Sequence, residues 1–271
     1  MSGKRSRGAL PWAVLGLAVL LFLGWAAAPA GALYARLLPP SRLLMIAALV
    51  KLVYLLAGSA FAFACRDRLE ADNPARPAWL LLSQGVLSMF AGQLCLAPFQ
   101  VVNGETPFPS VADMFFVLAY PFLIASFLVF LNAYREAGFP IGSLAERVGI
   151  VAGVGAVGVL VALPLLRPVA ATGGTLLERI LNVAYPVLDL VLLLPLALLL
   201  RIALRLRGSH AGDVWAILLG GFFVLSVADV IFAHFQALGA AHLDPLVHAS
   251  FILAYGLIAG GAHRQLQLLE S

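Results

Sequence analysis

Four polar side chains interrupt long apolar segments of this sequence at a similar depth: Lys51, Gln93, Asp189 and Asp229. Counted from the outer end of each segment at about 1.5 Å per residue, they lie on the order of 10–13 Å inside. A lone charge at that depth in a membrane costs several kcal/mol, so we expect Lys51 to pair with Asp189 or Asp229. The other carboxylate must then be protonated, hydrated or occupied by a ligand. Two interpretations stay open: a structural ion pair that fixes the helix register, and a ligand or proton site.

The same polar layer falls within an internal repeat. Five positions match five others at the same mutual spacing 136 residues later, and three more match at an offset of 135. The first set is Trp79, Gly85, Gln93, Phe99 and Gln100 with Trp215, Gly221, Asp229, Phe235 and Gln236, and the second is Asp113, Phe116 and Tyr120 with His248, Phe251 and Tyr255. Two parallel halves in a bilayer usually meet at an internal cavity. We therefore predict two four-helix repeats, residues 1–136 and 137–263, followed by a short tail, residues 264–271.

The candidate ligand-binding residues are the polar members of these two patterns. They are Lys51, Gln93, Asp113, Tyr120, Asp189, Asp229, His248 and Tyr255. Asp113 has a second interpretation, because Ser110 is placed to cap a helix whose first turn contains Asp113, where the helix dipole favours a carboxylate. The outer loop that precedes it, residues 100–110, is rich in turn formers and has no basic residue.

Composition requires a lipid environment for the elements that position these residues. The chain has 271 residues, of which 62% are hydrophobic and 11% charged, and its mean hydropathy is +1.01. A soluble domain of this size could not bury so much apolar surface. The net charge of +4 resides in short loops between apolar segments, which is typical of membrane topology and not of nucleic-acid binding. The bilayer is thus the first expected partner.

Eight apolar runs are long enough to span a membrane. They cover residues 10–34, 42–65, 78–99, 111–132, 145–166, 179–202, 213–236 and 246–263. We predict an all-α, polytopic transmembrane helix bundle. A cytoplasmic N-terminus places twelve basic residues inside and four outside, which are Lys4, Arg5, Arg7, Arg66, Arg68, Arg76, Arg135, Arg147, Arg201, Arg205, Arg207 and Arg264 against Arg36, Arg42, Arg167 and Arg179. This positive-inside bias predicts that both termini are cytoplasmic, as in a multi-pass protein of the bacterial inner membrane.

The first apolar run has a second interpretation as a signal peptide. It begins with a basic cluster, residues 4–7, and contains the small residues Ala26, Ala27 and Ala28, which together resemble a cleavage signal. The apolar stretch continues to Leu38, which is longer than a signal core needs. We favour a retained helix, and cleavage would leave seven spans with the same orientations.

Catalytic and metal-binding signatures are weak in this sequence. It contains no HExxH, GxSxG, CxxC or glycine-rich phosphate loop, so we predict no enzyme activity. Imidazole and carboxylate groups at His234, His242, Asp244 and His248 could suit a transition metal. Their spacing is not compact, and we predict no metal site. The sequence specifies no cofactor.

Residues 108–121, FPSVADMFFVLAYP, resemble the PSxAD-xx(F/Y)-xxxYP signature of a known family. That family is the polytopic N-terminal sensor region of bacterial, often actinobacterial, diguanylate cyclases and some sensor histidine kinases. Residues 184–189, AYPVLD, resemble its YPxLD motif, Ala228-Asp229 its AD pair, and residues 248–263 its last helix. His248 stands where the family commonly has Asp, and Phe251 where it has Trp. The resemblance implies a membrane sensor, and it implies either a separate signalling partner or a longer protein, because the family's output domain is not in this sequence.

We therefore predict a sensory or ligand-binding membrane module. It would detect an extracytoplasmic or membrane-dissolved small ligand and signal to the cytoplasm through its last helix, as a population shift limited by differential affinity. A proton- or ion-coupled transporter is the alternative, because repeats and buried carboxylates suit it as well. An assembly subunit of a larger membrane complex is the third hypothesis. The ligand and the signalling partner are not specified by the sequence.

Overall fold

A computed structural model describes residues 3–27, 38–104, 106–139, 141–171, 175–206, 208–239 and 244–271. Over these residues the chain is all-α, with eight α-helices and one π-helical turn. The helices are α1 (Gly3–Ala26), α3 (Pro40–Arg68), α4 (Arg76–Pro98), α5 (Val111–Glu136), α6 (Leu144–Ala171), α7 (Leu176–Arg205), α8 (His210–Ala237) and α9 (Asp244–Leu269), and the π-helical turn η1 is Phe99–Asn103.

Each predicted span coincides with one of these helices, and the helices are mostly longer than the spans. The first differs most, because α1 begins at Gly3 and ends at Ala26, whereas the predicted span is 10–34. Residues 28–34 of that span lie outside the described residues, as do Arg36, Glu105, Arg207 and His242. Apolar runs locate the lipid-spanning part of a helix, but the polar turns beyond it carry no apolar signal.

Local sequence explains where several helices begin. Pro40 is the first residue of α3, a position where proline's missing N–H is not needed. The side chain of Ser110 caps α5, that of Thr175 caps α7 and that of Ser209 caps α8. Each cap satisfies backbone donors that the helix itself cannot. The capping role predicted for Ser110 is confirmed.

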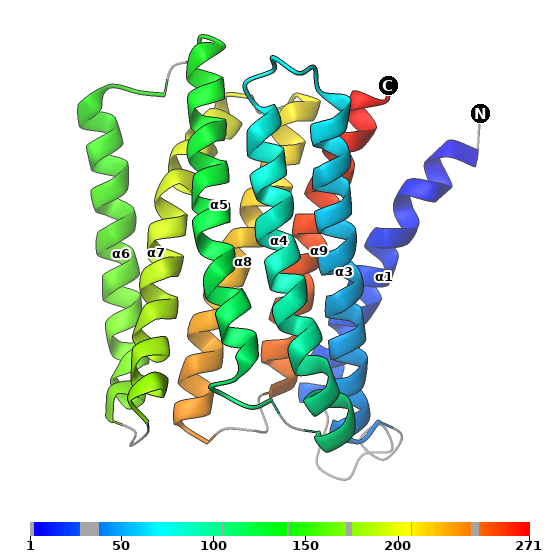
Figure 1. Cartoon of the computed structure of the whole chain (residues 1–271), viewed down its shortest axis with the longest axis vertical. Coiled ribbons are helices and arrows are strands. Elements are labelled where there is room, and N and C mark those ends of the chain that lie inside the picture. The colour runs from blue at the N-terminus through cyan, green and yellow to red at the C-terminus, as the bar shows by residue number, and fades with distance from the viewer. Residues whose placement is uncertain are drawn as a thin grey trace.

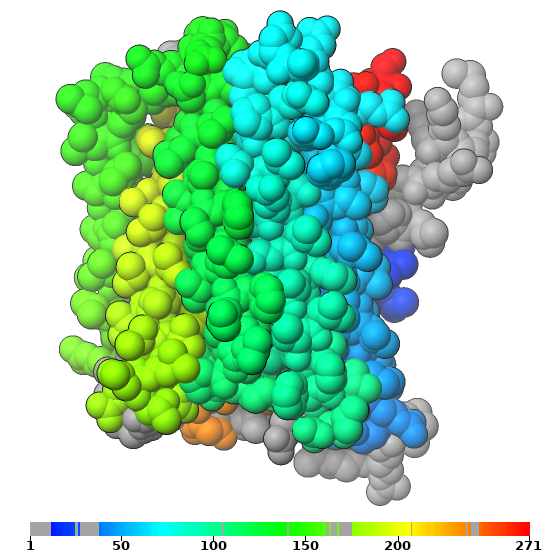
Figure 2. All heavy atoms as spheres, in the orientation of Figure 1, coloured from blue at the N-terminus to red at the C-terminus, as the bar shows by residue number. Residues whose placement is uncertain are grey.

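The outer surface of the bundle is apolar. Six helices, α3, α4 with η1, α5, α7, α8 and α9, are long and apolar enough to cross a membrane. Figure 2 shows one broad face on which α3, α4 and α5 lie side by side. Leu87 and Leu94 of α4 and Leu118 and Leu128 of α5 each expose about half of their surface. Such a face is unfavourable in water and favourable in lipid. The chain is a multi-pass membrane protein.

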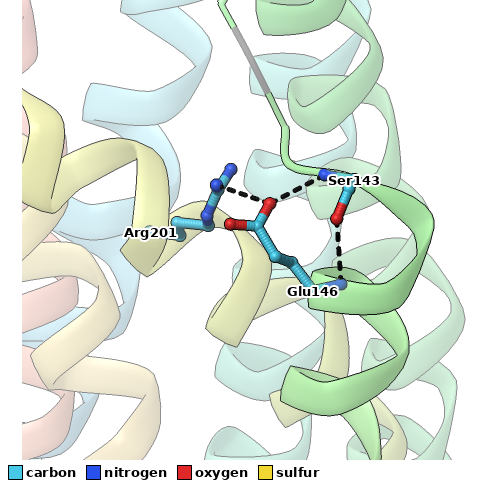
Figure 3. Close-up of polar contacts among 3 residues, drawn as sticks. All are labelled: Ser143, Glu146 and Arg201. Carbon is cyan, nitrogen blue, oxygen red and sulfur yellow. Dashed lines mark hydrogen bonds and ion pairs between the residues drawn. The ribbon is translucent and has the colours of Figure 1, made fainter.

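The two ends of the bundle are distinct. The start of α1 and the end of α9 lie at one end (Figure 1), hereafter the terminal end. The α4–α5 loop lies at the opposite end, hereafter the loop end. Near the terminal end, Arg201 of α7 pairs with Glu146 of α6 at 2.9 Å. Figure 3 shows that Glu146 also accepts a hydrogen bond from the backbone N–H of Ser143, so one carboxylate caps α6 and joins it to α7.

The repeated sequence positions make repeated contacts. The repeat matches α3 with α7, α4 with α8 and α5 with α9. In the first half α4 packs on α5, and in the second half α8 packs on α9. A Cβ atom on Gly85 would lie 2.6 Å from Leu123 Cδ2 and 3.3 Å from the Ala119 carbonyl oxygen. A Cβ atom on Gly221 would lie 2.9 Å from Ile258 Cγ1 and 3.1 Å from the Ala254 carbonyl oxygen. These glycines allow the close helix approach that small residues give in membranes, at offsets that match the repeat.

Contacts between the halves also correspond. The helix α3 packs on α9, and its matched helix α7 packs on α5. The helix α1 packs on α9, where Leu15 lies over Gly256 and Trp12 over Gly260. The loop-end halves of α3, α4, α5, α7, α8 and α9 surround an internal space.

Candidate functional site

A cavity of about 110 Å³ lies inside the bundle near the loop end. Its walls come from α3, α4, η1, α5, α7, α8 and α9, and the loop from Thr106 to Ser110 contributes to it. Aromatic rings and apolar side chains line much of the cavity, and polar side chains from each of these elements converge on it. A chamber that combines apolar walls with convergent polar groups is characteristic of small-molecule sites.

Lys51 lines the cavity with 4% of its surface exposed. Its Nζ lies over the ring of Phe251, 5.9 Å from the centroid, and in the described part of the chain it forms no ion pair. The predicted pairing of Lys51 with Asp189 or Asp229 is therefore wrong. The physical reason is the packing order, because α3 packs mainly on α4 and α9, whereas Asp189 lies on α7 and Asp229 on α8. The main neighbours of α7 are α5, α6 and α8, and those of α8 are α6, α7 and α9.

The two membrane carboxylates are joined by Tyr120 instead. The Tyr120 hydroxyl donates a hydrogen bond to Asp189 Oδ1 at 2.8 Å and also interacts with Asp229. Asp189 is 3% exposed, and its Oδ2 has no hydrogen-bond partner among the residues that the structure describes. Ser226 is beside it but donates its hydroxyl to the Phe222 carbonyl. Tyr120 and Asp229 line the cavity, and Asp189 lies behind Tyr120.

Asp113 caps α5 and also lines the cavity. Its Oδ2 accepts the backbone N–H of Ser110 at 2.6 Å, which completes a capping box at the start of α5. Its Oδ1 accepts the hydroxyl of Tyr185 at 2.6 Å. Asp113, Tyr185 and Ser110 all line the cavity. The cap holds the carboxylate in place, and Tyr185 connects α5 to α7 across the cavity wall.

A chain of amides forms another wall. Gln93 donates to Gln100 at 2.8 Å, and Gln100 donates to the Thr106 hydroxyl at 3.1 Å. Gln100 lies in η1, the π-helical turn that extends α4. Such turns redirect side chains and frequently occur at functional sites. Gln93 and Gln100 are 2% and 1% exposed, so this chain fixes the loop end of α4 from within.

His248 faces Lys51 from α9. The two side chains interact, and His248 Nδ1 is buried and has no hydrogen-bond partner in the described ranges of the chain. The ring of Phe22, from α1, packs edge-on against the imidazole with centroids 6.3 Å apart. The helix α1 thus covers the outside of this part of the cavity wall.

A layer of buried aromatic rings lies between the cavity and the terminal end, and we name it the aromatic floor. It consists of Trp79, Phe127, Phe130, Trp215 and Phe222. Phe127 and Phe222 meet edge to face with centroids 5.0 Å apart, and Phe130 meets Trp79 at 5.2 Å and Trp215 at 5.0 Å. The Trp215 N–H is donated to the Tyr134 hydroxyl. This packing closes the cavity toward the terminal end.

The structure brings the predicted site residues together. Seven line the one cavity: Lys51, Gln93, Asp113, Tyr120, Asp229, His248 and Tyr255. Asp189 contacts it through Tyr120. No group of three or more histidine, cysteine, aspartate or glutamate side chains suited to a metal occurs within the described residues.

Sequence reasoning did not select several lining residues. Gln100 and Phe116 were visible as repeat positions, and Tyr185 as part of the AYPVLD motif, but no role was assigned to them. Asn182 and Phe232 also line the cavity and carried no signal in the sequence. The spacing of residues along one helix shows which of them share a face. It does not show which residues of the neighbouring helices line the same cavity.

No protein-family model, curated protein or solved structure matches the chain. The functional interpretation therefore rests on the cavity and its chemistry.

Proposed function

We propose that this protein is a membrane sensory module that binds a small ligand in the cavity at its loop end. The observation that carries the proposal is the Lys51 side chain, which is 4% exposed, lines the cavity and forms no ion pair among the residues that the structure describes. A buried charge without a partner is costly. A ligand that supplies the missing partner would therefore be bound strongly.

The helix α9 offers a route from the cavity to the terminal end. His248, Phe251 and Tyr255 line the cavity near its start. At its other end Leu266, Leu268 and Leu269 pack against the main core, and Glu270 pairs with Arg68 at 2.9 Å. A ligand that shifts α9 would alter these contacts, in proportion to its differential affinity for the two states. The resemblance to cyclase and kinase sensor regions favours the same interpretation, with the loop end outside the cell.

The aromatic floor favours a receptor over a carrier. Transport requires a path through the bundle, and the five floor side chains are each 4% exposed or less. A carrier would have to separate these rings in every cycle. The internal repeat, with α4 packed on α5 and α8 on α9, is the observation that keeps a coupled transporter as the second candidate.

The proposal is tested by a thermal-shift screen of the full chain in detergent. The panel contains amino acids, carboxylates, amines, quinones and lipids, applied to wild type, Asp229→Asn and Asp213→Asn. Asp213 is an exposed residue in the first turn of α8, so it controls for loss of a charge on the same helix. A specific ligand raises the melting temperature by mass action, and we expect this in wild type and Asp213→Asn but not in Asp229→Asn.

Two further readouts separate the candidates. A ligand-dependent change in hydrogen exchange at the terminal end of α9 supports a sensor. Accumulation of the same ligand in proteoliposomes, dependent on Asp189, would establish a carrier instead. If no compound stabilises wild type, the cavity is a packing defect and the proposal fails.

A further inference from the structure

A basic and an acidic side chain lie at the two ends of one wall of the cavity. Lys51 lies over Phe251, and Phe251 stacks on Tyr255 with centroids 6.0 Å apart and an interplanar angle of 30°. Tyr255 in turn lies beside Asp229. Lys51 and Asp229 form no ion pair with each other. Two stacked rings therefore hold a cation and a carboxylate apart in the same chamber.

Among the described residues, the nitrogen atoms at the basic end of this wall have no hydrogen-bond acceptor or ion-pair partner. The Lys51 ammonium has three donors, and its recorded contacts are the face of Phe251 and the neighbouring His248. His248 Nδ1 has no partner in the described part of the chain, and Phe22, which is fully buried, closes the space behind the imidazole. A carboxylate can accept from both groups at once.

Two carboxyl groups, those of Asp189 and Asp229, lie together at the acidic end of this wall. Asp229 interacts with Asp189, and Tyr120 touches both. Asp189 Oδ2 is also without a hydrogen-bond partner among the described residues. No basic side chain is ion-paired with either carboxylate within residues that the structure describes. An ammonium group would supply the missing charge and donors.

We propose that the ligand of the cavity is a small zwitterion of the amino-acid class. Its carboxylate binds Lys51 and His248, its ammonium binds Asp229, and its hydrocarbon part packs against Phe116, Phe232 and Phe251. A zwitterion satisfies both ends without bringing net charge into the low-dielectric interior. The inference rests on the proposed function, because it names the ligand class of the same site.

The cavity volume limits the size of this ligand. Its 110 Å³ is somewhat smaller than the roughly 150 Å³ cavity that accommodates benzene in an engineered protein. The chamber therefore suits a compound with a short side chain. Among standard amino acids, alanine, valine and leucine cover the size range, and phenylalanine tests its upper limit.

The test uses three probes that share one carbon skeleton. Leucine carries both charged groups, isocaproate lacks the ammonium and isoamylamine lacks the carboxylate. Affinities are measured by calorimetry on the full chain in detergent, for wild type, Lys51→Met, Asp229→Asn and the control Asp213→Asn. Alanine, valine and phenylalanine are measured alongside to set the size limit.

We expect wild type to bind leucine, or one of the other amino acids, at least about tenfold more tightly than its two truncated analogues, because each lost charge-assisted contact is worth at least that factor. Lys51→Met should bind isoamylamine as well as it binds leucine, and Asp229→Asn should bind isocaproate as well as it binds leucine. The Asp213→Asn control should match wild type. This crossed pattern assigns each end of the ligand to one residue.

Other patterns overturn the inference. Equal binding of isocaproate and leucine by wild type would identify a simple anion site, and the proposed ligand-binding function would stand. Binding of some other compound of the wider panel, with no amino acid bound, would also refute the zwitterion and leave the proposed ligand-binding function standing. Absence of binding by every compound in both experiments would remove the zwitterion and the proposed function together.

Discussion

The hydrogen bond from Tyr120 to Asp189 offers a direct measure of how the carboxylates are held. In Tyr120→Phe the ring remains and only the hydroxyl is lost, so Asp189 loses its 2.8 Å partner. Tyr120 and Asp189 are 4% and 3% exposed, so water cannot easily replace the donor. Hydrogen bonds between membrane helices contribute about 0.6 kcal/mol on average and up to about 1.7 kcal/mol. A buried carboxylate acceptor belongs at the upper end, so we expect a loss of about 1.5 kcal/mol.

The repeat supplies a matched control for this substitution. Tyr255 corresponds to Tyr120 in the second half of the repeat. It is also 4% exposed and lines the same cavity. Among the described residues, its hydroxyl forms no hydrogen bond. We expect Tyr255→Phe to change the free energy of unfolding by less than about 0.5 kcal/mol.

The assay is equilibrium unfolding of the full chain in mixed micelles, followed by tryptophan fluorescence. A double-mutant cycle with Asp189→Leu isolates the pair, because Tyr120→Phe should cost little once the acceptor is gone. Equal effects of the two Tyr→Phe substitutions, or an undiminished effect in the Asp189→Leu background, would refute the assignment of this hydrogen bond.

Three further predictions concern packing and the terminal end. Gly221→Ala should lower the free energy of unfolding by about 1–3 kcal/mol, because the added Cβ lies 3.0 Å from the backbone nitrogen of Ile258. Gly220→Ala should be neutral, because its added Cβ meets nothing within 4 Å. Denaturation of both variants checks this prediction, and equal effects would contradict it. Phe127→Ala should cost about 3–5 kcal/mol, because a fully buried ring of the aromatic floor is lost, and a loss below about 1 kcal/mol in the same assay would contradict that role. Glu146→Gln should leave the free energy of unfolding nearly unchanged, because the exposed carboxylate forms a partly solvated ion pair, and a clear destabilisation would show that α6 depends on it.

Much of the fold follows from hydropathy alone. Apolar runs such as 42–65 and 213–236 match α3 and α8 within about three residues at each end, because a lipid-spanning helix must be apolar over its whole buried length. The start of α1 could not be predicted in this way, because Gly3 and the basic residues after it extend the helix without an apolar signal.

The site was predictable in its depth and not in its pairing. The residue count from the outer end of each apolar run places Lys51, Asp189 and Asp229 at a similar depth. The structure puts Lys51 and Asp229 in one cavity. Rotation about the bundle axis is not encoded in such counting, so the pairing of Lys51 was predicted wrongly. The partner of Asp189 is a tyrosine hydroxyl 69 positions away, which hydropathy does not reveal. The repeat and the motif placed Tyr120 among the candidates, but only packing shows what it touches.

The central claim, a ligand cavity that the aromatic floor closes toward the terminal end, is tested most directly by cysteine accessibility. In a background with Cys65→Ala and Cys95→Ala, the reporter Ala233→Cys lines the cavity and the reporter Leu218→Cys is fully buried on the terminal side of Phe222. A membrane-impermeant thiol reagent is applied from each side of the membrane. We predict that Ala233→Cys reacts only from the side of the loop end and that Leu218→Cys reacts from neither. Labelling of Leu218→Cys, or of Ala233→Cys from both sides, would contradict the closed floor and indicate a continuous path through the bundle.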